Sequence, residues 1–278
     1  GCASSFRRGR FEFETALHEI CEWGTAENPG GCRKTVVNDF GLNIIWHRIP
    51  DNFRVITTAS DGKTHIDATL PCGIENEMER LVPGCRESIQ NLFDLGTEFH
   101  AAGDYSLSVA GKTDPVYMKK HFPNFLRLGS YSINRVFKAM KMPKLAQDIM
   151  NTYWGYLGVD ADHLSFLQYV NMLWLYVTHG AWIPDKTSNE LTTGMLECFR
   201  KFGGEVWMNC TATRILFDDN KAVRGVETTC GTVNTRYILC NMNQNMVYAT
   251  MCPPEVVPER MVKLGNARTY SARMFIVY

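Results

Sequence analysis

The sequence predicts a mixed α/β fold in two parts, and two observations carry this prediction. Residues 183–250 show the pattern of one helix followed by a three-stranded antiparallel meander. Residues 44–182 instead combine a strand hairpin with several helices, so we expect a strand-plus-helix insertion between the two flanks of another sheet. With 278 residues, of which 45% are hydrophobic, the chain is long enough to bury two cores.

The N-terminal stretch reads GCASSFRRGRFEFETALHEI, and its alternating FEFET pattern indicates a strand. The start on Gly1 and Cys2 has two interpretations. Either Cys2 is the acylated residue of a mature bacterial lipoprotein, or Gly1 is the second glycine of a pair in a loop, which implies that further residues precede it. The basic run at residues 7–10 fits either a solvated turn or a phosphate contact.

The middle of the chain combines a hairpin pattern with several helical patterns. Asp61-Gly62 lies between two alternating runs and predicts a hairpin over residues 55–70, and apolar residues in helical phase predict a helix over 75–99. Further helices are expected to begin near Asp114, Pro143 and Asp162. Residues 164–184 carry no Asp, Glu, Lys or Arg, yet they are too polar for a membrane span, so we expect a buried helix.

The most regular segment is 183–250. Thr187 and Glu190 fit a capping box, and the apolar phase predicts a helix that ends at Gly203-Gly204. The strands of the meander are expected at 205–217, 222–229 and 232–240. The last strand leads into the uncharged CNMNQN, residues 240–245, where a backbone turn can approach a ligand.

Charge and cysteine usage argue against several classes of function. Lys and Arg number 29, as do Asp and Glu, so the formal charge is zero and nothing overall favours nucleic acid or an anionic membrane surface. The ten cysteines show no CxxC spacing. This favours free thiols in a reducing, cytoplasmic compartment over a zinc site or a disulfide framework, and no metal ion is expected.

Residues 1–20, 183–227 and 237–244 together resemble the flavin-dependent phytoene desaturase, carotenoid isomerase and retinol saturase family. In that family a strand and a GxGxxG helix come first, a Gly-Gly pair follows a ribose-binding acid, and an F-x-F-D-x-G segment runs past the flavin. The resemblance implies FAD as cofactor and an incomplete FAD/NAD(P)-binding Rossmann-like domain. That domain would comprise 1–43 and 183–250, and a substrate domain would comprise 44–182 and 251–278.

The resemblance also implies which residues meet the cofactor. They are Gly1, Cys2, Ser5, Phe6, Thr15, Ala16, Leu17, His18, Ala212 and Asn241. Ala212 stands where the family's backbone meets adenine. His18 and His179 are candidates for the substrate pocket, with a core histidine as the alternative for each, and the catalytic residues stay unknown. Glu14 and Ala16 replace the usual aspartate and glycine, and the methyl group of Ala16 narrows the approach to the flavin.

The function implied by the resemblance is an FAD-dependent oxidoreductase that acts on carbon–carbon bonds of a long apolar, isoprenoid-like substrate. Desaturation, saturation and isomerisation all remain open. Two alternatives belong to other classes: a flavin-dependent amine oxidase, which an aromatic cage would favour, and a lipid-anchored binding protein without enzymatic activity. The expected partner is an apolar small molecule rather than nucleic acid. The expected location is cytoplasmic, with peripheral membrane contact left open.

One expectation concerns the cofactor's pyrophosphate. Such folds hold it mainly at the start of the helix that follows the first strand, and in this reading that helix precedes Gly1. The chain also stops at MFIVY, in the middle of an expected strand. We therefore expect these residues alone to bind FAD poorly and to expose an open sheet edge.

Overall fold

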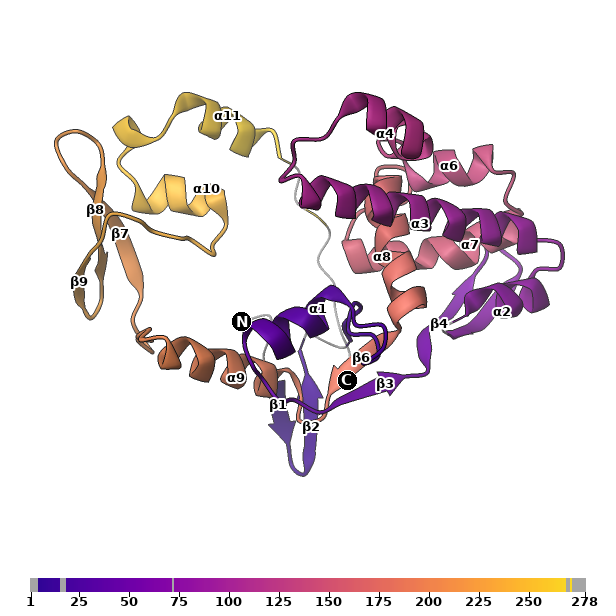
Figure 1. The fold of residues 1–278 in the computed structure, drawn as a ribbon, viewed down its shortest axis with the longest axis horizontal. Helices are drawn as coiled ribbons and strands as arrows, with labels where there is room; N and C mark the ends of the chain where they lie inside the picture. The colour runs from indigo at the N-terminus through magenta and orange to yellow at the C-terminus, as the bar shows by residue number, and fades with distance from the viewer. Residues whose placement is uncertain (1–4, 16–18, 72, 269–270, 272–278) are drawn as a thin grey trace. The chain divides into compact units, whose positions relative to one another are not determined.

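The computed structural model describes residues 5–15, 19–71, 73–268 and 271, and it has the predicted mixture of helices and strands (Figure 1). The chain divides into two compact units, the first ending at Phe202 and the second beginning at Gly203. The predicted domains, 1–43 with 183–250 and 44–182 with 251–278, divide the chain differently. Their assignment to cofactor and substrate stays a prediction.

The first unit begins with a hairpin. Strands β1 (Ser5–Arg8) and β2 (Phe11–Glu14) pair in antiparallel register, and Gly9 takes a φ of 61° in the turn between them. This confirms the strand expected from the FEFET pattern. Arg7 bonds Glu12 of the facing strand at 3.0 Å, so part of the basic run is engaged in an exposed ion pair.

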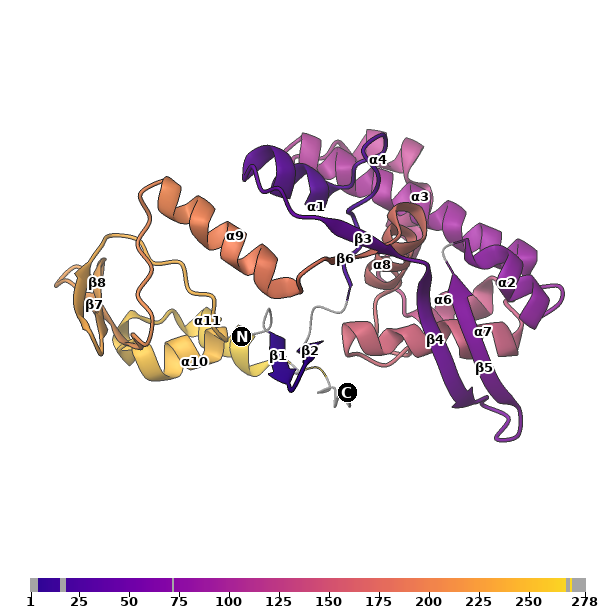
Figure 2. The same ribbon diagram turned by 90° about the horizontal axis from the view of Figure 1, so that it is seen from below.

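A second pair of strands joins the beginning and the end of segment 44–182. Strand β3 (Trp46–Ile49) runs antiparallel to β6 (Ala181–Pro184), and both views show the two side by side (Figures 1 and 2). Ile20 adds an isolated bridge to Trp182. Between β2 and β3 lie the short helix α1 (Gly31–Arg33) and a π-helical turn, Lys34–Asp39.

The hairpin predicted around Asp61-Gly62 is confirmed. Strands β4 (Asp51–Thr58) and β5 (His65–Pro71) flank the turn and run side by side in Figure 2. Asp61 Oδ1 accepts hydrogen bonds from two backbone N–H groups of the turn, each at 2.8 Å. Gly62 has a φ of 69°, a left-handed conformation that glycine adopts without steric cost.

The single helix predicted over 75–99 is wrong, because the chain breaks it in two. Helix α2 (Ile74–Leu81) stops before Pro83-Gly84, and α3 (Arg86–Ser108) starts after it. Gly84 takes a φ of 87°, and its N–H donates to Glu79 Oε1 at 2.9 Å. The proline and the left-handed glycine end one helix while the apolar phase continues into the next.

Five further α-helices complete the described middle segment, and two of them, α5 (Pro123–Leu128) and α8 (Phe166–His179), pack directly against α3. Helix α4 (Pro115–His121) begins as predicted after Asp114, whose carboxylate accepts from the Val116 N–H at 2.8 Å. Helix α8 begins four residues later than the expected Asp162, because Asp160 closes a turn there. The other helices are α6 (Ile133–Ala139) and α7 (Lys144–Asn151).

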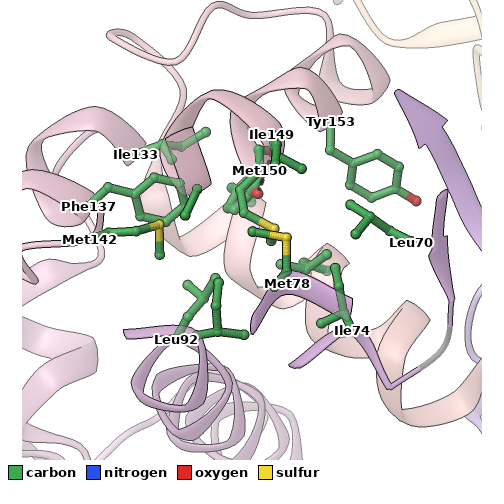
Figure 3. Close-up of a cluster of buried hydrophobic side chains, with 14 of the residues drawn as sticks. Leu70, Ile74, Met78, Leu92, Ile133, Phe137, Met142, Ile149, Met150 and Tyr153 are labelled. Atoms are coloured by element: carbon green, nitrogen blue, oxygen red, sulfur yellow. Dashed lines mark hydrogen bonds between the residues drawn. The ribbon is translucent and has the colours of Figure 1, made fainter. Parts of the chain in front are cut away.

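The core of the first unit lies where β5, α2, α3, α6, α7 and α8 meet. Figure 3 shows the thioethers of Met78 and Met150 meeting between Phe137 on one side and Leu70 on the other. Each such side chain stabilises the fold by roughly 1.5–3 kcal/mol through its burial. Tyr153 lies at the edge of this cluster beside Leu70 (Figure 3).

Helix α8 confirms the buried helix expected within 164–184. Phe166, Tyr169 and Leu173 are fully buried on it, and the Tyr169 hydroxyl donates to the Met150 carbonyl at 2.8 Å. In the part of the chain that the structure describes, no helix has the length and apolar character to cross a bilayer.

Helix α9 (Ser188–Lys201) confirms the helix predicted after Pro184, and Gly203 follows it with a φ of 83°. The predicted capping box is wrong at Thr187, whose side chain makes no capping bond and whose φ is 69°. The N-terminus of α9 is capped instead by a distant residue, which is described with the candidate site.

The second unit contains the predicted meander. Strands β7 (Ala212–Phe217), β8 (Val223–Thr228) and β9 (Gly231–Asn234) pair in that order. Residues 205–211 and 235–240, expected as parts of strands, lie outside them. The helices that follow are α10 (Gln244–Met246) and α11 (Glu259–Asn266), and a π-helical turn extends α10 (Figure 1).

Candidate functional site

Glu14 ends strand β2 and is buried, with 9% of its surface exposed. One carboxylate oxygen accepts from the Ser188 N–H at 2.5 Å, and the other accepts from the Ser188 hydroxyl at 2.6 Å. Ser188 is the first residue of α9, so the carboxylate satisfies a free N–H at the positive end of the helix dipole. The N-terminus of α9 is thereby occupied and is not offered to a pyrophosphate.

Three of the predicted cofactor residues lie on or beside the N-terminal hairpin. Ser5 accepts a hydrogen bond from the Asn189 side chain and donates to Glu12 Oε1 at 3.3 Å, so it lies near the start of α9. The Phe6 ring stacks on Phe13 with 5.2 Å between centroids. Thr15 follows Glu14 and is half-buried. Gly1, Cys2, Ala16, Leu17 and His18 lie outside the described residues, and their roles stay predictions.

A pocket of about 380 Å³ lies directly beyond this segment, between β4 and the turn that follows α7. Glu19, Asn52, Phe53, Tyr153 and Tyr156 are among its lining residues. Burial raises the pKa of Glu19 from 4.5 to about 7, and the Tyr153 hydroxyl opposes part of that increase. Glu19 therefore exchanges a proton near neutral pH.

The phenols around Glu19 stay neutral. Burial raises the pKa values of Tyr153, Tyr156 and Tyr176, and the hydroxyls of the last two lie 2.8 Å apart. The Tyr153 ring stacks on Phe53 at 4.3 Å. The pocket thus combines aromatic walls with a carboxyl group suited to proton transfer. Sequence reasoning missed Glu19, for which the only signal was an acid next to the predicted pocket residue His18.

His179, the second predicted pocket residue, is the last residue of α8 and is half-buried. Burial lowers its pKa, against the opposing effect of Glu22, and its buried Nδ1 has no hydrogen-bond partner. Its carbonyl accepts from Trp182 Nε1 at 2.7 Å, and its ring meets Trp174 edge-on at 5.9 Å. The imidazole is therefore neutral at pH 7, and its contact with a substrate stays a prediction.

A separate cavity of about 380 Å³ is lined by several tryptophans of the first unit. Trp23 stacks on Trp46 with 4.1 Å between ring centroids, and the Arg33 guanidinium lies 5.4 Å from the Trp23 centroid. Trp182 also lines it. Because a cation already faces Trp23, a second cation beside the same ring is disfavoured.

The second unit contains a larger cavity, of about 760 Å³. Strand β7 contributes Ile215 and Phe217, and the following turn contributes Cys240 and residues 242–245. Arg268 adds a guanidinium, which donates to Gln244 at 3.0 Å. The uncharged stretch 240–245 therefore borders a cavity large enough for a small molecule.

The two predicted cofactor residues of this unit are both exposed. Ala212 is the first residue of β7, which pairs with β8 alone among the described strands and so has an open edge. Asn241 lies between two residues that line the cavity. An open strand edge offers backbone N–H and C=O groups, and the small Ala212 side chain leaves them accessible, while contact with adenine stays a prediction.

No protein-family model matches the chain. Over 240 residues, 81% of this chain and 38% of the relative, the sequence is 22% identical to an all-trans-retinol 13,14-reductase from Danio rerio. An oxidoreductase structure from Methanosarcina mazei matches with a TM-score of 0.65 at 12% identity, over 96% of this chain and 57% of that one. A Rab GDI from Plasmodium falciparum gives 0.49 at 13% identity, over 83% and 50% of the two chains.

The match to the Methanosarcina mazei structure shows the fold that the two proteins share. Together with the retinol reductase it supports the predicted relationship to oxidoreductases, while the narrower family stays a prediction. The chain spans 38% of the length of the curated relative and 57% of that solved chain.

Proposed function

We propose that the protein is an FAD-dependent oxidoreductase that acts on carbon–carbon bonds of a long apolar, isoprenoid-like substrate. The observation that carries this proposal is the similarity to a retinol reductase over 81% of the chain. Retinol is an apolar polyene, which agrees with the substrate class expected from the sequence. We further propose that the protein binds an apolar small molecule and does not bind nucleic acid, and that it lies in the cytoplasm or at the periphery of a membrane.

The proposed cofactor contacts follow the resemblance. Residues 1–18 would pass the flavin, Ala212 would meet adenine through its backbone, and Asn241 would contact the cofactor from the turn 240–245. FAD supplies hydride transfer when bound, while the protein orients it and excludes water. The open edge of β7 and the cavity beside 240–245 support this placement.

Glu19 is the proposed proton donor. Saturation of a double bond needs one hydride and one proton, and a carboxyl with a pKa of about 7 supplies a proton near neutral pH. Tyr153 and Tyr156 line the same pocket, and their rings give it apolar walls. The segment 44–182, which contributes these tyrosines, is the proposed substrate domain together with 251–278.

The alternatives receive less support from the described residues. The tryptophan cluster at Trp23 has the Arg33 guanidinium over one of its rings, which disfavours an ammonium ion at that ring. The lipid-anchored alternative depends on Cys2, which lies outside the described residues.

The experiment is anaerobic reduction of the bound flavin. The protein is expressed within its natural coding sequence, and the flavin spectrum is followed with retinoids, carotenoids and primary amines in turn. We expect redox exchange between the flavin and a polyene, in either direction. Flavin reduction by amines alone would favour the amine oxidase, and a purified protein without flavin would contradict the proposal.

A further inference from the structure

Two cysteines face each other at the open end of the β7–β8 hairpin. In the register of this pair Ala212 lies opposite Thr228, and beyond it the Thr229 N–H donates to the Thr211 carbonyl at 2.9 Å. The ladder ends there: Cys210 precedes β7, and Cys230 is the second residue of the turn that joins β8 to β9. Cys230 Sγ lies 4.0 Å from the carbonyl oxygen of Asn209, the residue before Cys210, so the two cysteines are neighbours at this end of the hairpin.

Both side chains lie at the same end of the hairpin. The Thr228 hydroxyl lowers the pKa of Cys210, and the neighbouring Cys230 adds to this decrease, while Cys210 raises the pKa of Cys230. The Thr228 hydroxyl holds both residues: it lies 3.3 Å from Cys210 Sγ and accepts from the Cys230 N–H at 3.1 Å. The two residues therefore have different characters, since Cys210 is the more acidic and half-buried thiol and Cys230 is exposed.

We propose that Cys210 and Cys230 are a reversible redox modification site, which a small-molecule disulfide such as oxidised glutathione converts from a dithiol into a disulfide across the end of the hairpin. This inference does not depend on the proposed flavin chemistry. Both thiols are free in the structure. The spacing of the cysteines in the sequence did not predict a disulfide between them.

The reaction proceeds by two thiol–disulfide exchanges. The Cys210 thiolate attacks one sulfur of oxidised glutathione, a mixed disulfide forms, and the first glutathione leaves and takes up the proton that Cys210 has lost. Cys230 then attacks Cys210 Sγ, the mixed disulfide breaks, and the second glutathione leaves with the proton from Cys230. Two protein thiols are oxidised and one small disulfide is reduced.

The other described cysteines differ from this pair. Cys21 and Cys32 interact through their charges, but burial raises the pKa of each thiol, which disfavours the reactive thiolate. Cys85 and Cys198 are buried, where an external disulfide has little access. Cys240 raises the pKa of Cys252 through its charge, so these two are near each other, but no hydrogen bond joins them. They provide an internal comparison within the same unit.

The test is peptide mapping of the native protein. Reduced protein is equilibrated with glutathione buffers of increasing oxidised fraction, free thiols are blocked, and trypsin is added without reductant. Cleavage at Lys201, Arg214, Arg224 and Arg236 separates peptide 202–214, which contains Cys210, from peptide 225–236, which contains Cys230. We expect one linked species of these two peptides, the loss of two free thiols per chain, and separation of the peptides when reductant is added.

Variants make the assignment specific. Cys210→Ser and Cys230→Ser should each abolish the linked species, whereas the matched control Cys240→Ser, which removes another exposed cysteine of this unit, should leave it unchanged. The native protein decides the outcome even if a variant fails to fold. Glutathione adducts without linked peptides, or linkage of Cys240 to Cys252 in more oxidised chains than Cys210 to Cys230, would overturn the proposal.

Discussion

Glu14 and Ser188 are 174 positions apart in the sequence, and hydrogen bonds join them. The carboxylate of Glu14 thereby caps the first residue of α9. Replacement by alanine leaves the Ser188 N–H and hydroxyl without their partner in a buried place. We expect Glu14→Ala to lower the free energy of unfolding by about 1–3 kcal/mol, as measured by urea denaturation.

The matched control for this variant is Glu12→Ala on the same strand. Glu12 is paired with Arg7 in an exposed position, and such pairs contribute roughly 0–1 kcal/mol. Equal losses of stability in the two variants would show that the cap on α9 contributes nothing beyond an ordinary surface interaction.

Glu19 makes stability depend on pH. Its pKa rises from 4.5 in the unfolded chain to about 7 in the fold, so the folded state favours the protonated carboxyl. The associated stability is fully present below pH 4.5 and is lost as pH rises through 7. The folded protein should therefore lose stability over this interval, and Glu19→Gln, which stays neutral, should lose less.

Denaturation of wild type and variant at about pH 5 and about pH 8 measures this difference. Glu87→Gln, at an exposed carboxyl of α3, is the control and should follow the wild type. If Glu19→Gln and the wild type lose the same amount of stability between the two pH values, the carboxyl is already ionised in the folded protein.

Two glycines of α3 offer a test of helix packing at the scale of the element. A methyl group on Gly96 would lie 2.7 Å from Cδ1 and 2.9 Å from Cβ of Trp174 on α8, whereas one on Gly103 would meet nothing within 4 Å. Trp174 is held in place by a bond to Thr97 Oγ1 at 2.9 Å and by stacking on His100.

We expect Gly96→Ala to destabilise the protein by about 1–3 kcal/mol, because the indole cannot retreat without losing these contacts. Gly103→Ala should instead stabilise it by about 0.5–1 kcal/mol through helix propensity alone. Thermal unfolding of the two variants gives the sign of each change. Stabilisation by both would show that α3 and α8 separate freely at this point.

Elements with a strong local signal were predictable from the sequence. The Asp61-Gly62 turn and the apolar phase of α9 are both set within a few residues, and both are confirmed. The break at Pro83-Gly84 was missed because α2 and α3 face the same core, so their apolar pattern runs through the interruption. Residues 205–211 alternate like a strand but lie outside the meander.

The candidate site was less accessible to prediction. Glu14 was read as a departure from a flavin-binding pattern, and its bond to Ser188 is a long-range contact that no local pattern contains. The raised pKa of Glu19 comes from burial, and only the fold brings Glu19 into one pocket with Tyr153 and Tyr156. Ala212 and Asn241 came from resemblance, and the structure adds the open strand edge and the cavity beside them.

At the scale of the whole molecule, the segment after α9 should be the first to be cut by a protease. Phe202 and Trp207 are 83% and 50% exposed, and residues 203–211 lie in neither helix nor strand. Limited chymotrypsin digestion should cleave here, or after the 86% exposed Tyr237, before it cleaves any helix of the first unit.

Mass spectrometry of the early fragments identifies the cut. Phe202→Ser combined with Trp207→Ser should slow the release of the fragment that ends in this segment, while the tyrosines of α8 stay protected. Early fragments that end between Ile74 and His179 would show that the core of the first unit opens more readily than its contacts imply.

The pairing of β3 with β6 has a consequence for the order in which the nascent chain matures. β3 leaves the ribosome long before β6, so its backbone waits on the order of ten seconds for a partner at ordinary rates of synthesis. The residues between them hold most of the apolar cluster and can collapse during that interval. The strand Trp46–Ile49 therefore pairs late in the maturation of the chain. Chaperones that bind extended segments would find this strand unpaired during translation and paired afterwards.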